Sequence, residues 1–185
     1  MENLDLRVQK TYMALINSFN LLLKNKDFED ISVTEICDGA MVRRQTFYKH
    51  FIDKYDFLTY FVKRRINHIF MEAFKNAEVT ESNFYAMIFK QLIKELDESI
   101  LLIFKLQMQA DTILELESIK EFGKNMLSTM ESNDSINKGE KYLEYKRYMI
   151  MSLTINSVNW YKQNKHNISY EEIMSFYNDL LNAIQ

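Results

Sequence analysis

The segment from Arg43 to His50, with the sequence RRQTFYKH, gathers side chains that suit nucleic-acid recognition. Arginine donates two hydrogen bonds to guanine in the major groove, and glutamine pairs in a similar way with adenine. Hydroxyl, amine and imidazole groups suit phosphate oxygens. No acidic residue follows until Asp53. A solvated helix face can have a similar composition, but this concentration of base-edge and phosphate donors favours contact with DNA.

Charge is distributed unevenly along the chain. The formal net charge is −3. Between Ala40 and Arg65, however, seven basic residues accompany only two acidic ones, so this stretch has a charge of +5 and the rest of the chain −8. A basic patch on an acidic body directs a polyanion to one face of the molecule.

A helix-turn-helix unit is the element that would present such a segment to DNA. Ser32 followed by Glu35 predicts a capping box at the start of a short helix, and Gly39 is expected to end that helix in a left-handed conformation. The second helix is predicted from about Arg43 to His50. Its apolar anchors would be Val42, Phe47 and Phe51, facing Ile36 and Cys37 of the preceding helix.

The composition of the 185 residues favours an all-helical chain. There is no proline and there are only three glycines, whereas sheets joined by tight turns usually need more of both. The single cysteine, Cys37, excludes an internal disulfide and fits a reducing compartment. No apolar run approaches membrane-spanning length and the N-terminus lacks the pattern of a signal peptide. We therefore expect a cytoplasmic protein without membrane contact.

Hydrophobic periodicity predicts about nine helices. They are expected at residues 6–23, between Ser32 and Gly39, and at residues 43–50, 54–77, 84–96, 99–106, 113–130, 142–164 and 170–183, with a loop at 132–140. Asp53 is expected to cap the fourth helix, and Ser169 with Glu172 to form a capping box on the last.

Residues 46–51, TFYKHF, resemble the T-x-Y-x-H-F core of the TetR family of transcriptional regulators, and residues 54–58, KYDFL, resemble the K-x-D-L-L sequence that follows it. The resemblance covers about the first third of the chain. It implies an all-α fold with an N-terminal three-helix bundle, the helix-turn-helix DNA-binding domain, in residues 1–53, and a helical regulatory and dimerisation domain in residues 54–185. The predicted DNA-binding residues are Ser32, Thr34, Arg43, Arg44, Gln45, Thr46, Tyr48, Lys49, His50 and Lys54.

The chain departs from the family pattern at two positions. The family usually has glycine in the turn and a small residue at the start of the recognition helix, where this chain has Met41 and Arg43. Methionine makes a left-handed turn more costly than glycine does. Arginine removes the small cap and adds a further base or phosphate contact. Both differences affect which DNA sequence is preferred.

The resemblance also implies a homodimer formed through the last two helices, Tyr142–Asn164 and Ser169–Ala183. The residues fit this expectation, because the stretch from Tyr148 to Tyr161 is apolar on nearly all sides and would expose much apolar surface in a monomer. Residues 160–164 and 168–173 additionally resemble a subgroup related to the dihydroxyacetone-kinase regulators.

The C-terminal part is rich in methionine and aromatic residues. Such residues most often form a core, but flexible apolar side chains also line adaptable pockets. The residues predicted to line a pocket for a small apolar effector are Phe84, Met87, Phe104, Met108, Met126, Tyr145, Met149 and Trp160.

The sequence therefore predicts a homodimeric regulator that binds double-stranded DNA at a palindromic operator, acting as a repressor that a small molecule releases. The alternative is a TetR-fold coactivator whose C-terminal body binds a protein partner. We do not expect an enzyme, a cofactor or a metal site, because the three histidines and one cysteine form no recognisable nucleophilic or metal-binding constellation.

Overall fold

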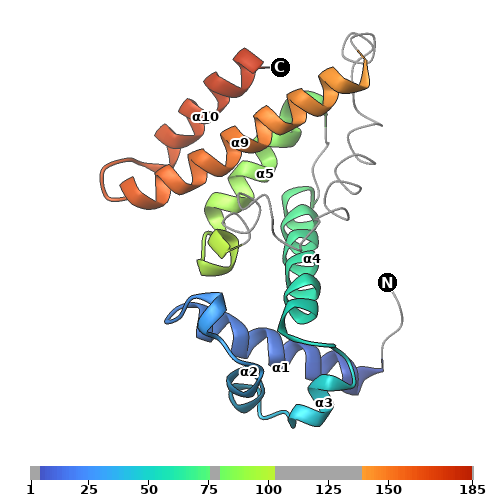
Figure 1. Cartoon of the computed structure of the whole chain (residues 1–185). Helices are drawn as coiled ribbons and strands as arrows, with labels where there is room; N and C mark the ends of the chain where they lie inside the picture. The colour runs from blue at the N-terminus through green and yellow to red at the C-terminus, as the bar shows by residue number, and fades with distance from the viewer. Residues whose placement is uncertain (1–4, 76–79, 103–138, 185) are drawn as a thin grey trace. The chain divides into compact units, whose positions relative to one another are not determined.

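The computed structural model describes residues 5–75, 80–102 and 139–184. Every regular element within these ranges is helical (Figure 1), which confirms the predicted all-α class. None of the helices described has the length and apolar character needed to cross a bilayer. The expected helix at 113–130 and most of the expected loop at 132–140 lie outside the described residues. In chain order the elements are α1 (Leu6–Leu23), the 3₁₀ helix η1 (Phe28–Asp30), α2 (Val33–Gly39), α3 (Arg44–Tyr48), α4 (Lys54–Ala73), α5 (Glu81–Lys94), a helical stretch at 98–102, α9 (Glu140–Asn164) and α10 (Tyr170–Ile184).

The chain divides into two compact units, and the division falls inside α4, between Arg64 and Arg65. The reason is the burial of Phe57 and Phe61, two residues of α4. The ring of Phe19 in α1 meets these two rings edge-on, at centroid distances of 5.5 and 4.9 Å. The start of α4 thus completes the core of the first unit, whose described part, residues 5–64, is called the head below.

Two of the head helices, α2 and α4, begin at the caps that the sequence predicts. Ser32 Oγ accepts a hydrogen bond from the backbone N–H of Glu35, and the Glu35 carboxylate accepts one from the backbone N–H of Ser32, so the capping box is present. Asp53 Oδ1 accepts hydrogen bonds from the N–H groups of Tyr55 and Asp56, each 2.8 Å long. These bonds satisfy backbone donors that have no partner in the first turn of a helix.

The turn between α2 and α3 differs from the prediction in one respect. Met41, and not Gly39, has the left-handed conformation, with φ of 54°. The N–H of Val42 donates to the carbonyl of Cys37 and the N–H of Met41 to that of Asp38, which is the hydrogen-bond pattern of a Schellman motif. A residue other than glycine pays about 1–2 kcal/mol for this conformation.

Gly39 is a glycine for a steric reason. It continues α2 with ordinary helical backbone, and a Cβ atom on it would lie 2.3 Å from Oγ and 3.3 Å from Cβ of Ser18 in α1. Ser18 is itself buried, and its hydroxyl has no hydrogen-bond partner among the described residues. The close contact between α1 and α2 therefore depends on the absence of a side chain at Gly39.

The second unit, whose described part is called the body below, is built around α5, α9 and α10. Within it Tyr177 stacks on Phe89 with ring centroids 3.8 Å apart, and its hydroxyl lies 2.8 Å from that of Thr154. Burial raises the pKa of Tyr177 to about 12. At the start of α10, Ser169 and Glu172 form the predicted capping box. The buried residues of this core are Ile69, Phe89, Leu92, Ile93, Ile100, Ile150, Ile155, Val158, Ile173, Tyr177 and Leu181.

A polar network joins the body part of α4 to the end of α5. The guanidinium of Arg65 donates to the carboxylate of Glu95 at 2.6 Å and to that of Asp97 at 3.1 Å. It also donates to the backbone carbonyl of Glu95 and to the hydroxyl of Ser99. Arg65 and Glu95 are both largely shielded from solvent, so this ion pair is screened less than a surface pair.

We predict that Gly39→Ala destabilises the head and that Ser18→Ala rescues it. The new methyl group of the first variant overlaps the Ser18 hydroxyl, and overpacking of this kind costs about 1–3 kcal/mol. The double variant removes the overlapping oxygen, which is also an unsatisfied buried group. Urea denaturation followed by circular dichroism should show a lower midpoint for Gly39→Ala and recovery of most of the loss in Ser18→Ala/Gly39→Ala. Equal losses in the single and double variants would contradict the steric explanation.

Candidate nucleic-acid interface

The five-residue helix α3 is held in place by the residues on its inner side. Phe47 is completely buried, and its ring packs against those of Phe51 and Phe57 at centroid distances of 5.4 and 5.7 Å. Beneath it, Ile36 and Cys37 of α2 are also completely buried. Burial, together with the neighbouring charge of Asp38, raises the pKa of the Cys37 thiol. Four of the anchors predicted from the sequence, Phe47, Phe51, Ile36 and Cys37, are therefore buried as expected. The fifth, Val42, is only half-buried.

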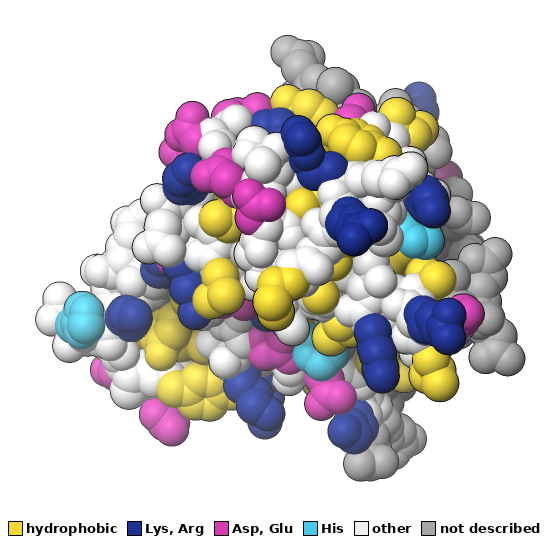
Figure 2. All heavy atoms as spheres, turned by 90° about the horizontal axis from the view of Figure 1, so that it is seen from below, with side chains coloured by type: hydrophobic (Ala, Val, Ile, Leu, Met, Phe, Trp, Pro, Cys, Tyr) yellow, Lys and Arg dark blue, Asp and Glu magenta, His cyan; other side chains and the backbone are white. Residues whose placement is uncertain are grey.

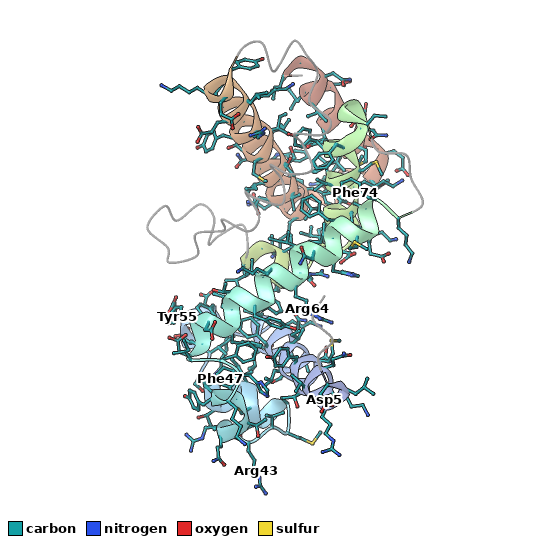
Figure 3. The ribbon with its side chains drawn as sticks, turned by 90° about the vertical axis from the view of Figure 1, so that its right-hand side faces the viewer. Asp5, Arg43, Phe47, Tyr55, Arg64 and Phe74 are labelled. Atoms are coloured by element: carbon teal, nitrogen blue, oxygen red, sulfur yellow. The ribbon has the colours of Figure 1, made fainter. Side chains whose placement is uncertain are left out.

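The outer side of α3 carries the polar residues. Arg43 is the N-cap of the helix and forms no side-chain capping bond; its carbonyl accepts the N–H groups of Thr46 and Phe47. Figure 3 shows Arg43 projecting from the surface of the head, whereas Phe47 lies inside it. Within the part of the chain that the structure describes, no hydrogen bond or ion pair occupies the exposed side chains of Arg43, Arg44, Gln45 and Lys49.

This arrangement gives one end of the head a set of free donors. Figure 2, in which the molecule is seen from below, shows Lys and Arg side chains spread over this face, with exposed hydrophobic side chains between them. The regular helix ends at Tyr48, two residues before the predicted end, and Lys49 and His50 continue it as a turn bonded back to Thr46 and Phe47. Guanidinium, amide and ammonium groups without internal partners are available to an external anion or base edge.

The remaining polar candidates are more constrained. His50 packs its ring edge-on against Tyr12 of α1, with centroids 5.2 Å apart. Tyr48 is more than half exposed and leans on Phe47. Thr34 is exposed on α2, whereas Thr46 is partly covered.

The hydroxyl of Ser32 is engaged by the capping box. It accepts a hydrogen bond from the Glu35 N–H at 3.2 Å and donates one to the Glu35 carboxylate at 2.8 Å. The same carboxylate forms an ion pair with Lys26. The bonds from Lys26 and then from Ser32 lower the pKa of Glu35 to about 2.

Lys54 has a structural task that the sequence does not reveal. Its ammonium donates to three backbone carbonyls around η1, those of Phe28, Glu29 and Ile31, at 3.4, 2.9 and 3.3 Å. An ammonium has three N–H donors, so all of them are used. It also lies over the ring of Phe28, 4.7 Å from the centroid, and the side chain is only 19% exposed. Lys54 therefore connects η1 to the N-terminal end of α4.

A neighbouring contact strengthens the same junction. The hydroxyl of Tyr55 donates to the carboxylate of Glu29 at 3.1 Å, and this bond is the main reason that the pKa of Tyr55 is raised. Its ring meets that of Phe28 edge-on, with centroids 5.4 Å apart. The contacts span more than twenty residues of sequence, so no local pattern could have predicted them.

The candidate effector residues do not form one group in the described structure. Phe84 is buried in a small aromatic cluster, stacked on Phe74 with centroids 5.1 Å apart, and Met87 on the same helix is half-buried. Three others, all on α9, are exposed: Tyr145, Met149 and Trp160. Phe104, Met108 and Met126 lie outside the described residues. Among the described residues no group of three or more His, Cys, Asp or Glu side chains is placed to hold a metal ion.

No protein-family model and no curated protein matches the chain. Solved structures do match it along nearly its whole length. A TetR-family regulator from Marinobacter aquaeolei VT8 is 16% identical, with 96% of each chain covered and a TM-score of 0.69. FadR from Bacillus subtilis, crystallised with stearoyl-CoA, is 15% identical over 94% of this chain and 97% of its own, with a TM-score of 0.65. The dihydroxyacetone kinase operon activator DhaS is 20% identical over 94% of each chain, with a TM-score of 0.53.

The chain thus has the fold of the TetR-family transcriptional regulators, with a helix-turn-helix in its head. The fold therefore confirms the resemblance to the TetR family that the T-x-Y-x-H-F motif of residues 46–51 indicates.

We predict that Lys54→Met lowers the stability of the head, whereas Lys49→Met does not. The first substitution leaves three carbonyls of the η1 turn without their shared donor, and a hydrogen bond to a charged group contributes about 1.5–3 kcal/mol. Lys49 is exposed and forms no such bonds, so it is the matched control. Thermal melting should separate the two variants by several degrees. Equal melting temperatures would show that the Lys54 contacts contribute nothing.

Proposed function

We propose that this protein is a DNA-binding transcriptional regulator that recognises its operator with α3. The observation that carries the proposal is the set of uncommitted side chains at the start of α3, namely Arg43, Arg44 and Gln45, presented by a short helix whose opposite side is buried. The solved structures with the same fold include proteins described as transcriptional regulators, which supports this assignment.

Different residues of the interface contact the bases and the phosphates. Arg43, Arg44 and Gln45 are at the helix end that enters the major groove in helix-turn-helix proteins, so they read base edges. Thr34, Tyr48 and Lys49, which are exposed on α2 and at the end of α3, contact phosphates. Ser32, Thr46 and His50 contribute less, since each is engaged in the capping box or partly covered. Lys54 is withdrawn from the interface, because its donors are used internally.

The protein acts as a homodimer formed by α9 and α10. Both helices bury one side in the body and leave large apolar side chains on another: Tyr145, Tyr148, Met149, Met151 and Trp160 on α9, and Phe176 and Leu180 on α10. Apolar surface of this extent marks an interaction site. Two copies related by a two-fold axis would recognise a palindromic operator.

The regulatory cycle is repression relieved by a small apolar effector. FadR was crystallised with stearoyl-CoA, so this fold can accommodate a ligand with a long apolar chain. The methionine and aromatic residues of the body suit a ligand of apolar character.

We predict that operator affinity falls steeply with salt and that Arg44 and Lys49 contribute in different ways. Lys49→Ala should weaken binding to all sequences and reduce the slope of log affinity against log salt by about 1, because one phosphate contact is lost. Arg44→Ala should relax the preference at one base position, where a mismatch otherwise costs about 1–3 kcal/mol. Fluorescence anisotropy with duplexes from beside the chain's own gene, at several salt concentrations, measures both effects.

Lys165→Ala provides the control for this experiment. Lys165 is an exposed lysine at the end of α9, outside the head, so its removal should leave the salt slope unchanged. The proposed function loses its basis if the wild-type chain shows no salt-sensitive binding to these duplexes. It also loses support if Lys165→Ala has the same effect as Lys49→Ala.

We predict that Leu180→Glu dissociates the dimer. A carboxylate at the centre of an apolar interface has no partner and is costly to bury. Light scattering should give about twice the 22.2 kDa chain mass for the wild type and the monomer mass for the variant. Leu21→Glu is the matched control, since Leu21 of α1 is similarly exposed but belongs to the head. A monomeric wild type would refute the dimer and favour a body that binds a different protein.

A further inference from the structure

Two apolar side chains flank α3 and are more exposed than any other large hydrophobic residue in the described part of the chain. Met41, in the turn before α3, is 95% exposed, and Ile52, in the turn after it, is 85% exposed. Exposed apolar side chains on a monomer surface need no explanation when they are scattered singly. Here the two most exposed ones lie directly beside the free donors of the candidate interface.

Met41 is the more informative of the two because its backbone is strained. It has φ of 54° at the C′ position of the Schellman motif that ends α2. Glycine adopts this conformation freely, whereas a residue with a Cβ atom does not. A side chain that is 95% exposed buries almost no apolar area in return. In the free protein, Met41 therefore lowers the free energy of unfolding and contributes almost no packing. A favourable contribution of this side chain would have to come from contact with a bound partner.

The position of Met41 indicates which partner this is. Two residues further on, Arg43 is the N-cap residue of α3 and projects from the head (Figure 3). Met41 thus enters any complex that Arg43 and Arg44 form with DNA. A thioether has nothing to offer a phosphate, but an apolar side chain can pack against the C5-methyl group of thymine, which lies in the major groove. Methionine is flexible enough to reach such a group from a turn.

We propose that Met41 is a specificity-determining residue that contacts the methyl group of one thymine in each operator half-site. This inference rests on the proposed function. A protein surface is a less suitable partner for this residue, because the neighbouring helix α3 and its end carry the charges of Arg43, Arg44 and Lys49, which have no ionic partner in the described structure. The left-handed turn holds the methionine at the edge of the recognition helix, where a glycine would leave the thymine methyl uncovered.

The test combines a change in the protein with the removal of one methyl group from the DNA. The wild-type chain first selects its preferred duplexes from a library with 30 random base pairs, a length of about three helical turns. Each thymine of the selected sequence is then replaced by deoxyuridine, which lacks only the C5-methyl group. Affinities are measured for the wild type, Met41→Leu, Met41→Gly and Met41→Asn. Glycine and asparagine tolerate left-handed backbone, so both variants should melt at or above the wild-type temperature.

For the wild type, replacing one particular thymine of each half-site by deoxyuridine should lower the affinity about fourfold, the value expected for one buried methyl group. Met41→Leu should discriminate between the thymine and deoxyuridine duplexes almost as strongly as the wild type does. Met41→Gly and Met41→Asn should bind the two duplexes equally well. Ile52→Ala is the control: it removes an apolar side chain that is 85% exposed and follows α3 in the sequence, and it should leave the thymine-to-deoxyuridine affinity ratio as in the wild type.

The outcomes separate this inference from the proposed function. If the wild type selects no sequence at all, the proposed function fails. If it selects a sequence but no thymine methyl affects its affinity, Met41 has no such contact and the inference is wrong. It is also wrong if Met41→Gly weakens binding to thymine and deoxyuridine duplexes by the same factor, because the residue would then affect DNA binding without contacting the thymine methyl group.

Discussion

A five-residue helix cannot sustain itself in water, so α3 exists only because Phe47 is buried beneath it. Forming a first helical turn is unfavourable, and isolated helices shorter than about 12 residues are marginal even in favourable sequences. Phe47 and Phe51 compensate for this by packing on the aromatic rings of α1 and α4. Since the apolar side of α3 supplies its stability, its polar side is free to serve another purpose. The aromatic core and the exposed donors are therefore two consequences of one arrangement.

The basic residues of the chain fall into two groups with different tasks. Lys26, Lys54 and Arg65 are joined to carboxylates or backbone carbonyls and hold elements together. Arg43, Arg44 and Lys49, in the second group, keep their donors unused within the described structure. A count of charges along the sequence includes both groups, and so the charge of +5 between residues 40 and 65 overstates what a ligand meets.

The sequence predicts well those features that depend on neighbouring residues. The capping boxes, the bounds of α1 and the burial of Phe47 and Phe51 follow from local spacing, and the structure confirms them. Sequence patterns fail where distant segments meet. The role of Lys54 depends on carbonyls more than twenty residues away, and the extent of the head depends on rings of α4 packing on α1. Gly39 is another example: a glycine is needed there because of the close contact with Ser18 of α1, and not because of the turn that follows α2.

The reactivity of Cys37 can be used to measure local unfolding of the head. It is the single cysteine of the chain, it is completely buried beneath α3, and its raised pKa keeps the thiol protonated. Alkylating reagents attack the thiolate, so the folded head protects this sulfur twice, by exclusion and by protonation. The rate at which an alkylating reagent modifies the intact protein therefore measures how often α2 and α3 separate from the core. Operator DNA that holds these helices closed would slow the same reaction, which makes occupancy of the interface visible without any label.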